Sequence, residues 1–250
     1  TFLIYFTSGT SGNPKMVSHS HTYCLGHIPT AKYWHNVVED GIHHTAADTG
    51  WGKAVWGNLY GQWIAGTAVF IYDYVRFDGI KLLEKVIENK VNTFCAPPTI
   101  YRFLIKEDLS GIDLSSIVHC STAGEPLADE VYNKWMELTG HEIREGFGQT
   151  ETTLCIFNFG TEKVKPGSVG KPSPYYDLHL LDDDLHDVGV GTVGQIAFKL
   201  NKEMFPDRNG RFPGLVCEYY GEPEKTAVAF HDGYYFTGDQ AWKDDEGYYW

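Results

Sequence analysis

Several absences in this sequence narrow its function. No apolar run approaches the roughly 20 residues that a helix needs to cross a bilayer, and no signal peptide is visible. The net charge is −13, so the chain would repel a nucleic-acid backbone. We therefore expect no transmembrane segment and no nucleic-acid partner.

Metal and disulfide patterns are also missing. The eleven histidines show no HExxH or similar ligand spacing, and the five cysteines form no CxxC pair. An odd number of cysteines is typical of small buried thiols in a reducing compartment. A cytoplasmic location is the expectation, with targeting left open because the chain begins inside a predicted strand.

The hydrophobic periodicity predicts an α/β fold with two parts. Strands alternate with helices in residues 1–165, which favours a mostly parallel sheet with flanking helices. Helices are expected over 80–90, 99–107 and 126–139, and strands over 1–6, 91–96, 117–121 and 142–145. Residues 166–250 predict a smaller antiparallel β subdomain, with strands over 177–182, 193–200 and 234–242 and a hairpin turn at 244–247.

The most informative segment runs from Thr7 to Lys15 and reads T-S-G-T-S-G-N-P-K. Such a loop can turn backbone N–H groups and hydroxyls inward, and the lysine adds positive charge, so phosphate is the expected ligand. A kinase-type P-loop needs four residues between its glycines, whereas Gly9 and Gly12 have two between them. The dinucleotide pattern G-x-G-x-x-G is not met either. The alternative is a polar surface turn.

Three further segments follow the loop in order: S-T-A-G-E-P-L at 121–127, E-G-F-G-Q-T-E-T at 145–152 and Y-F-T-G-D at 235–239. Together the four resemble the motifs of the adenylate-forming superfamily, which includes acyl-CoA synthetases, the adenylation domains of peptide synthetases and firefly-luciferase-type enzymes. The segment 47–51 and the pair His19-Ser20 are most similar to the medium-chain acyl-CoA synthetase branch. The sequence resembles the central portion of such an enzyme, without the family's N-terminal region and C-terminal domain.

The resemblance implies a site for ATP. The loop would bind the pyrophosphate end, Phe147 would contact the adenine, Asp239 the ribose and Thr150 the α-phosphate region, while Glu151 would hold Mg²⁺. The implied ATP- and AMP-binding residues are Thr7, Ser8, Gly9, Thr10, Ser11, Gly12, Lys15, Gly124, Glu125, Pro126, Glu145, Gly146, Phe147, Gly148, Gln149, Thr150, Glu151 and Asp239. The implied catalytic residues are Lys15, Thr150 and Glu151, and the implied acyl-pocket residues are Trp51, Gly52 and Gly148.

Each of these residues also has a structural alternative. Lys15 and Glu151 would then be solvated surface residues, Phe147 a core residue and Asp239 a turn residue. A separate argument from topology favours the site. Ligands of α/β sheets gather at the carboxyl ends of the strands, and the Thr7 loop and the two segments that begin at 121 and 145 each follow a predicted strand. The four segments are therefore expected to form one pocket.

The predicted reaction joins a carboxylic acid to the α-phosphorus of ATP, releases pyrophosphate, and then transfers the acyl group to CoA. Glycine at position 148, where acetate-specific relatives carry a bulky tryptophan, favours short-to-medium-chain fatty or aryl acids. Two alternatives stay open: an adenylation module that loads a carrier-protein thiol, and an ATP-binding fragment without turnover. The oligomeric state is also open, a homo-oligomer included.

Overall fold

A computed structural model describes residues 1–7 and 14–250. The chain divides into two compact units. The first unit contains residues 1–26, 148–156 and 171–250, and the second contains residues 27–147 and 157–170. Among the described residues, no helix combines the length and the apolar character needed to cross a membrane.

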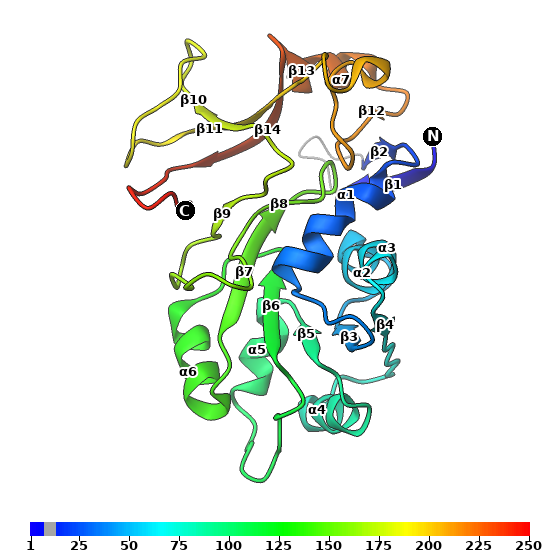
Figure 1. Cartoon of the computed structure of the whole chain (residues 1–250), viewed down its shortest axis with the longest axis vertical. Helices are drawn as coiled ribbons and strands as arrows, with labels where there is room; N and C mark the ends of the chain where they lie inside the picture. Colours follow the sequence, from blue (N-terminus) through cyan, green and yellow to red (C-terminus); the bar gives the residue numbers. More distant parts are fainter. Residues whose placement is uncertain (8–13) are drawn as a thin grey trace. The chain divides into compact units, whose positions relative to one another are not determined.

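The second unit is built on parallel strands (Figure 1). Its strands are β3 (Ile42–Thr45), β4 (Ala68–Val69), β5 (Thr93–Cys95), β6 (His119–Ala123) and β7 (Ile143–Gly148). They lie in the order β4-β3-β5-β6-β7, and the registers of β3 with β4 and β5, of β5 with β6 and of β6 with β7 are all parallel. Its helical segments are η1 (Thr30–Trp34), α2 (Gly52–Asn58), α3 (Tyr60–Ile64), α4 (Gly79–Glu88), α5 (Pro98–Leu104) and α6 (Asp129–Thr139). The predicted α/β class and mostly parallel sheet are confirmed.

One hydrophobic core joins α4, α5 and α6 to strands β5, β6 and β7. The helix α4 begins where the Asp78 carboxylate accepts a hydrogen bond from the Lys81 backbone N–H at 3.0 Å, which is an ordinary N-cap. The rings of Tyr101 in α5 and Trp135 in α6 meet edge to face at 5.1 Å, and both side chains are fully buried. This packing holds the strands rigidly, so that residues at their carboxyl ends have fixed positions.

The first unit is mostly antiparallel. One sheet has the order β1-β2-β12 and another the order β10-β11-β14-β13, with every pairing antiparallel. The strands are β1 (Leu3–Thr7), β2 (Lys15–His19), β10 (Leu178–Leu181), β11 (Gly194–Lys199), β12 (Glu218–Tyr219), β13 (Phe230–His231) and β14 (Tyr234–Ala241). The remaining elements that lie wholly or partly in this unit are α1 (Tyr23–Pro29), β8 (Leu154–Phe157), β9 (Lys171–Pro172), η2 (Pro206–Arg208) and α7 (Pro223–Ala229). The predicted strands over 177–182, 193–200 and 234–242 are confirmed.

The first strand departs from the prediction. The segment 1–6 was expected in the parallel sheet, but β1 pairs antiparallel with β2, with Thr7 opposite Lys15. The expectation that the phosphate loop follows a parallel strand is therefore wrong. The physical reason is the short connection, because strands joined by few residues pair antiparallel, whereas a parallel pair needs a long crossover. An apolar run predicts a strand but does not identify its partner.

The start of α6 also differs from the prediction. The helix was expected to carry Pro126 in its first turn, but it begins at Asp129 with Ala128 as its N-cap. The preceding residues form a loop, in which the Leu127 backbone N–H donates to the Glu145 carboxylate at 3.2 Å. The C-terminal end is as expected, since Gly140 adopts a left-handed conformation with φ of 74°.

The division into units differs from the predicted boundary at residue 165. Residues 1–26 and 148–156 group with the C-terminal part of the chain rather than with the α/β part. The cause is strand pairing: Val17 in β2 lies opposite Tyr219 in β12, and the Val216 N–H donates to the Glu151 carbonyl at 2.7 Å. Contacts between distant segments decide a domain, and a change of composition along the chain does not reveal them.

Candidate active site

In the first unit, Gln149 joins two of the predicted nucleotide-binding segments. Its amide nitrogen Nε2 donates to the Thr237 carbonyl at 3.0 Å and to Oδ2 of Asp239 at 2.5 Å. Gln149 and Asp239 are separated by 90 positions in the sequence. The predicted ribose-binding carboxylate thus lies directly beside the segment predicted to contact the phosphates and the metal.

Glu151, the predicted metal ligand, belongs to the same arrangement. The hydroxyl of Tyr219 donates to its Oε1 at 2.9 Å, and the ammonium of Lys15 lies 5.0 Å from the centre of the Tyr219 ring. The second carboxylate oxygen of Glu151 has no protein hydrogen-bond partner among residues 1–7 and 14–250. A tyrosine therefore orients one oxygen, and the other can accept a ligand.

The backbone of Thr150 is held by His19. Its carbonyl accepts a hydrogen bond from Nε2 of His19 at 2.8 Å, and burial lowers the pKa of that imidazole from 6.5 to about 4. The ring is therefore neutral at pH 7, with its proton on Nε2. Two residues after Thr150, the Thr152 hydroxyl accepts a hydrogen bond from the Gln149 backbone N–H at 3.0 Å. These bonds fix the turn that presents Gln149 and Glu151.

The first unit therefore contains Thr7, Lys15, Gly148, Gln149, Thr150, Glu151 and Asp239 of the predicted site. The predicted loop residues Ser8, Gly9, Thr10, Ser11 and Gly12 lie outside the described residues. Their two flanks are described, since Thr7 ends β1 and Lys15 begins β2 in register with it. That register fixes where the loop leaves the sheet and where it returns.

In the second unit, a cavity of about 440 Å³ lies at the carboxyl ends of parallel strands. It contains Gly124 and Glu125, which follow β6, and Trp51, which precedes α2. The full lining is Ala46, Ala47, Asp48, Trp51, Lys53, Tyr74, Pro97, Thr99, Ile100, Ala123, Gly124 and Glu125. Its volume falls within the roughly 300–1,000 Å³ of small-molecule sites. The predicted acyl residue Trp51 and two predicted adenine-side residues thus share one cavity, while Gly52 and Pro126 do not line it.

Glu125 is held in place by a small polar network. Its Oε1 accepts from the Thr99 backbone N–H at 2.9 Å, from the Thr99 hydroxyl and from the Arg102 guanidinium at 3.1 Å. The hydrogen bond from Thr99 and the nearby charge of Arg102 lower the pKa of Glu125. The carboxylate is therefore ionised and fixed at one edge of the cavity.

Glu145 has a different environment from the one predicted. Its side chain is only 6% exposed, and burial raises the pKa of its carboxyl group to about 7. Its Oε1 accepts from the Leu127 N–H, so Glu145 positions the loop that carries Glu125 and Pro126. Gly146 is buried and the Phe147 side chain is half-buried at the end of β7. Glu145 thus supports the loop of the predicted site, and its contact with the nucleotide stays a prediction.

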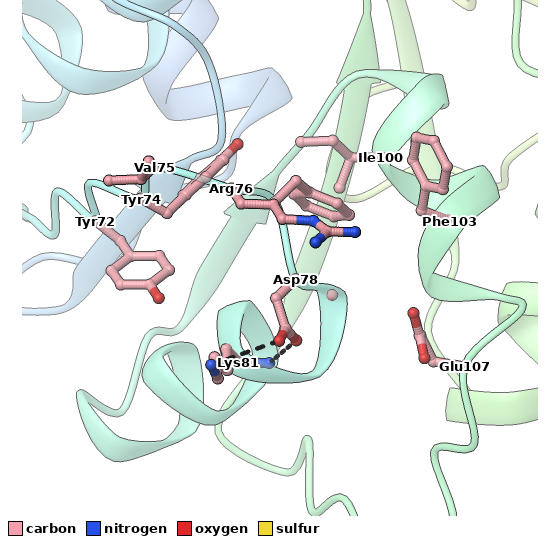
Figure 2. Close-up of a pocket in the computed structure, with 11 residues that line it drawn as sticks. Tyr72, Tyr74, Val75, Arg76, Asp78, Lys81, Ile100, Phe103 and Glu107 are labelled. Atoms are coloured by element: carbon pink, nitrogen blue, oxygen red, sulfur yellow. Dashed lines mark hydrogen bonds and ion pairs between the residues drawn. The ribbon is translucent and has the colours of Figure 1, made fainter.

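A larger cavity of about 1110 Å³ adjoins the first one and contains none of the predicted site residues. The two cavities share Tyr74 and Ile100. Figure 2 shows aromatic side chains, the Arg76 guanidinium and the Asp78–Lys81 pair around it. Its lining mixes aromatic and charged residues without a convergent set of catalytic groups.

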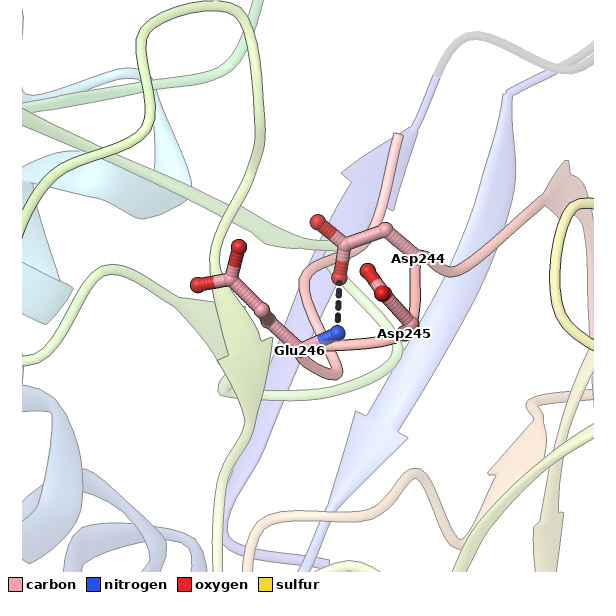
Figure 3. A group of neighbouring side chains, drawn as sticks. All are labelled: Asp244, Asp245 and Glu246. Carbon is pink, nitrogen blue, oxygen red and sulfur yellow. Dashed lines mark hydrogen bonds between the residues drawn. The ribbon is translucent and has the colours of Figure 1, made fainter.

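The carboxylates of Asp244, Asp245 and Glu246 lie within 4.8 Å of one another in the first unit. Figure 3 shows the Asp244 carboxylate directed at the Glu246 backbone nitrogen, a hydrogen bond of 3.0 Å. The same oxygen accepts from the Tyr248 N–H at 2.8 Å. These bonds are those of the predicted hairpin turn, which the bridge between Lys243 and Tyr249 confirms.

Sequence reasoning missed two residues of these sites, Tyr219 and Lys53. Tyr219 lies in a two-residue strand with no motif around it, so no sequence signal pointed to it. Lys53 directly follows the predicted acyl-pocket pair Trp51 and Gly52, and a lysine in an otherwise apolar helix was a usable signal. The structure adds that Nζ of Lys53 donates to the Ala123 carbonyl, at the end of β6.

The fold and these residues define a class. The model of the family described as AMP-binding enzyme matches residues 1–205, so the chain belongs to this family of AMP-binding enzymes. The predicted resemblance to the adenylate-forming superfamily is thereby confirmed.

The chain is similar to curated acyl-coenzyme A synthetases. It is 38% identical over 248 residues to the mitochondrial protein ACSM3 of Mus musculus and 40% identical over 248 residues to the mitochondrial protein ACSM5 of Homo sapiens. Each alignment covers 99% of this chain and 42% of the relative. The chain thus spans less than half the length of these relatives.

Solved structures show the same fold. An anthranilate CoA ligase, AuaEII, crystallised with anthranoyl-AMP, has a TM-score of 0.84 and 29% identity, over 99% of this chain and 46% of that one. An acyl-CoA synthetase from Brucella canis has a TM-score of 0.85 and 24% identity, over 99% of this chain and 44% of that one. At that lower identity the second likeness supports the fold alone.

Proposed function

We propose that this chain is the acid-activating part of an AMP-forming acyl-CoA synthetase. It would bind ATP and a carboxylic acid and form an acyl-adenylate with release of pyrophosphate. The observation that carries the proposal is the bonding of Gln149 to Asp239, together with that of Tyr219 to Glu151, in a chain whose family is that of AMP-binding enzymes.

The proposed first step joins two anions. A carboxylate oxygen attacks the α-phosphorus of ATP, the bond from that phosphorus to the bridging oxygen breaks, and pyrophosphate leaves with the electron pair. The main task of the protein is alignment and fixed positive potential. Lys15 supplies charge at the base of the loop, Asp239 accepts hydrogen bonds from the ribose hydroxyls, and the turn at Thr150 lies beside the α-phosphate.

Magnesium fits the donor set of the first unit. A hard cation prefers carboxylate oxygens, and Mg²⁺ typically takes one or two of them together with phosphate oxygens. Glu151 offers one oxygen oriented by Tyr219 and a second oxygen open to a ligand. Bound there, Mg²⁺ would neutralise charge on the phosphates.

The proposed second step transfers the acyl group to CoA. The thiol sulfur attacks the acyl carbonyl of the adenylate, and AMP leaves as the phosphate monoester. The names of the relatives, acyl-coenzyme A synthetases and an anthranilate CoA ligase, favour CoA over a carrier protein as acceptor. The carrier-protein alternative predicts a carrier domain in the same or a partner chain.

The proposed substrates are short-to-medium-chain fatty acids or aryl acids. The apolar and aromatic part of the 440 Å³ cavity, from Trp51, Tyr74 and Ile100, supports an acyl or aryl group larger than acetyl. Gly148 was predicted to deepen the same pocket, and since it belongs to the first unit its contribution stays a prediction. The curated relatives are mitochondrial proteins, which makes the mitochondrion as strong a proposal for the compartment as the cytoplasm.

A pyrophosphate-exchange assay tests the proposal. The complete protein is incubated with ATP, Mg²⁺ and labelled pyrophosphate in the presence of acetate, butyrate, octanoate, benzoate or anthranilate. We expect label to enter ATP only when an acid is present, with octanoate or an aryl acid above acetate. Exchange highest with acetate would reject the proposed substrate class, and ATP binding by calorimetry without exchange for any acid would favour the binding-fragment alternative.

A further inference from the structure

The 440 Å³ cavity of the second unit has an unusual combination of surfaces. Much of its lining is apolar or aromatic, including Trp51, Tyr74, Pro97 and Ile100. Among the twelve described lining residues, Lys53 is the one lysine or arginine. The lining also contains two carboxylates, Asp48 and Glu125, so a ligand with an apolar body and one anionic group fits the cavity only if other groups hold these carboxylates.

The position of the Lys53 ammonium is fixed by the fold. Lys53 lies in the first turn of α2, and its Nζ donates to the Ala123 carbonyl at the carboxyl end of β6. An ammonium carries three N–H donors. Within the described part of the second unit, Ala123 O is its hydrogen-bond acceptor, which leaves two donors for a ligand in the cavity.

The carboxylates of the lining do not neutralise this ammonium by direct contact. Glu125 accepts hydrogen bonds from Thr99 and forms its ion pair with Arg102 at 3.1 Å. Asp48 accepts from the Gly50 N–H at 2.7 Å, a local turn contact. Burial lowers the pKa of Lys53, more than the nearby Glu125 raises it. A half-buried ammonium without a contacting carboxylate is stabilised by an anionic ligand.

Gly124 keeps the wall beside the ammonium open. Its φ is +101°, a conformation that residues with a side chain rarely adopt. A Cβ at this position would lie 3.5 Å from Nζ of Lys53, and both residues line the cavity. The absence of a side chain at residue 124 therefore leaves access to the two remaining donors.

We propose that Lys53 binds the carboxylate of the acid substrate in this cavity, with the acyl or aryl group against Trp51, Tyr74 and Ile100. This proposal rests on the proposed function and adds to it a substrate-binding residue that orients the attacking oxygens. Two N–H donors on two carboxylate oxygens fix the plane of the nucleophile before it meets ATP.

Calorimetry without ATP tests this role separately from catalysis. The probes are octanoate and benzoate, and each is matched with its neutral amide of nearly the same shape. For the unmodified protein we expect the acid to bind more tightly than the amide. In Lys53→Met, which keeps an unbranched side chain one atom shorter and removes the charge, the ratio of acid to amide affinity should fall about tenfold or more. Lys53→Arg should retain much of the preference.

The control is Lys106→Met, which removes one exposed lysine of the same unit outside the cavity lining. It should leave the ratio unchanged, and thermal melting confirms that each variant is folded. A purely structural Lys53 would lower the affinity for acid and amide alike, and that result would overturn the proposal. Equal affinity of acid and amide for the unmodified protein, or no binding of either, would overturn it too.

Failure of this inference is distinguishable from failure of the proposed function. If Lys53→Met still exchanges pyrophosphate with an unchanged KM for the acid, the proposed adenylation stands and the proposed role of Lys53 is wrong. If the protein prefers the acid over its amide through Lys53 but exchanges no pyrophosphate, the role of Lys53 in binding stands and the proposed adenylation fails.

Discussion

The two units hold their predicted site residues in different ways. In the first unit the residues bond directly to one another across antiparallel strands and turns, as Gln149 does to Asp239 and Tyr219 to Glu151. In the second unit they surround a cavity at the carboxyl ends of parallel strands, as Trp51, Gly124 and Glu125 do. The first arrangement suits charged groups that need oriented partners, and the second suits a flat or apolar group that needs shape.

The same contrast decides what the topology can predict. A cavity lies at the segment after β6, where the rule that ligands gather at the carboxyl ends of parallel strands predicts a site. The rule fails for the segment after β1, because that strand pairs antiparallel with β2. The phosphate-loop motif therefore stays a prediction that rests on its sequence alone, without support from the topology of β1.

The largest expected effect is the loss of folding stability at low pH, which we expect to differ between the two units. Burial lowers the pKa of His35, His43, His44 and His119 in the second unit, and of His19 in the first. Below pH 6.5 the unfolded chain binds protons that these folded rings do not, so the stability falls as the pH falls. His119 and His19 have pKa values of about 4. Each of them lowers the free energy of unfolding by about 1.4 kcal/mol per pH unit between pH 6.5 and pH 4.

Glu145 opposes this trend in the second unit. Its pKa of about 7 lies above the ordinary 4.5, so between these values the folded carboxyl group holds a proton that the unfolded one releases. Glu145 therefore adds stability as the pH falls, and this gain offsets the loss of stability caused by about one of the four histidines. We expect hydrogen exchange, followed by mass spectrometry from pH 7 to pH 4.5, to show loss of protection in the second unit first. Earlier loss in the first unit would contradict this order.

The sequence alone predicted much of the second unit and little of the pairing in the first. The apolar stripe of α4 and the apolar segment around β5 are local patterns, and both elements formed close to their predicted bounds. The two-residue strand β12 and the register of Val17 with Tyr219 depend on residues 202 positions apart, and no local pattern encodes them. The bounds of the units followed from those pairings.

The candidate site divides in the same way. Motifs located Glu151 and Asp239 because short segments of unusual composition mark them. They did not locate Tyr219, which donates to Glu151, and they marked His19 without showing that it donates to the Thr150 carbonyl. They assigned Glu145 to the nucleotide, which stays a prediction, and they did not show that its buried carboxyl group accepts a hydrogen bond from the Leu127 N–H. The supporting hydrogen bonds join residues far apart in the sequence, so a local motif does not reveal them.

The second prediction tests the charged arrangement of the first unit. Glu151→Gln keeps the shape and the acceptor for Tyr219 and removes the negative charge proposed to hold Mg²⁺. The rate of pyrophosphate exchange should fall by about 100-fold or more, as it does when a preorganised electrostatic contact is lost. Glu203→Gln, an exposed position in the same unit, is the matched control and should leave the rate unchanged. An equal rate in both variants would show that Glu151 does not hold the metal ion.

The third prediction concerns the bond that links the two motifs. Asp239→Asn replaces the charged acceptor of Gln149 and of the proposed ribose hydroxyls by an amide. Because hydrogen bonds to charged groups contribute about 1.5–3 kcal/mol, the Kd of ATP should rise by roughly 10- to 100-fold in calorimetry. The exposed Asp207 of the same unit supplies the control, Asp207→Asn. If ATP binds both variants alike, Asp239 serves only the turn.

The smallest expected effect separates two buried tyrosines of the first unit. Tyr219 donates to Glu151 at 2.9 Å, whereas Tyr235 donates to Oε1 of Gln149 at 3.4 Å, close to the limit of a hydrogen bond. Tyr219→Phe leaves the Glu151 carboxylate without its orienting donor, at a cost of about 1 kcal/mol. The Mg²⁺ concentration that gives half-maximal exchange should therefore rise about fivefold, while Tyr235→Phe should leave it nearly unchanged. Equal shifts in the two variants would mean that the tyrosines act through packing alone. The direct hydrogen bond from Tyr219 to Glu151 would then not distinguish the first unit from the cavity of the second.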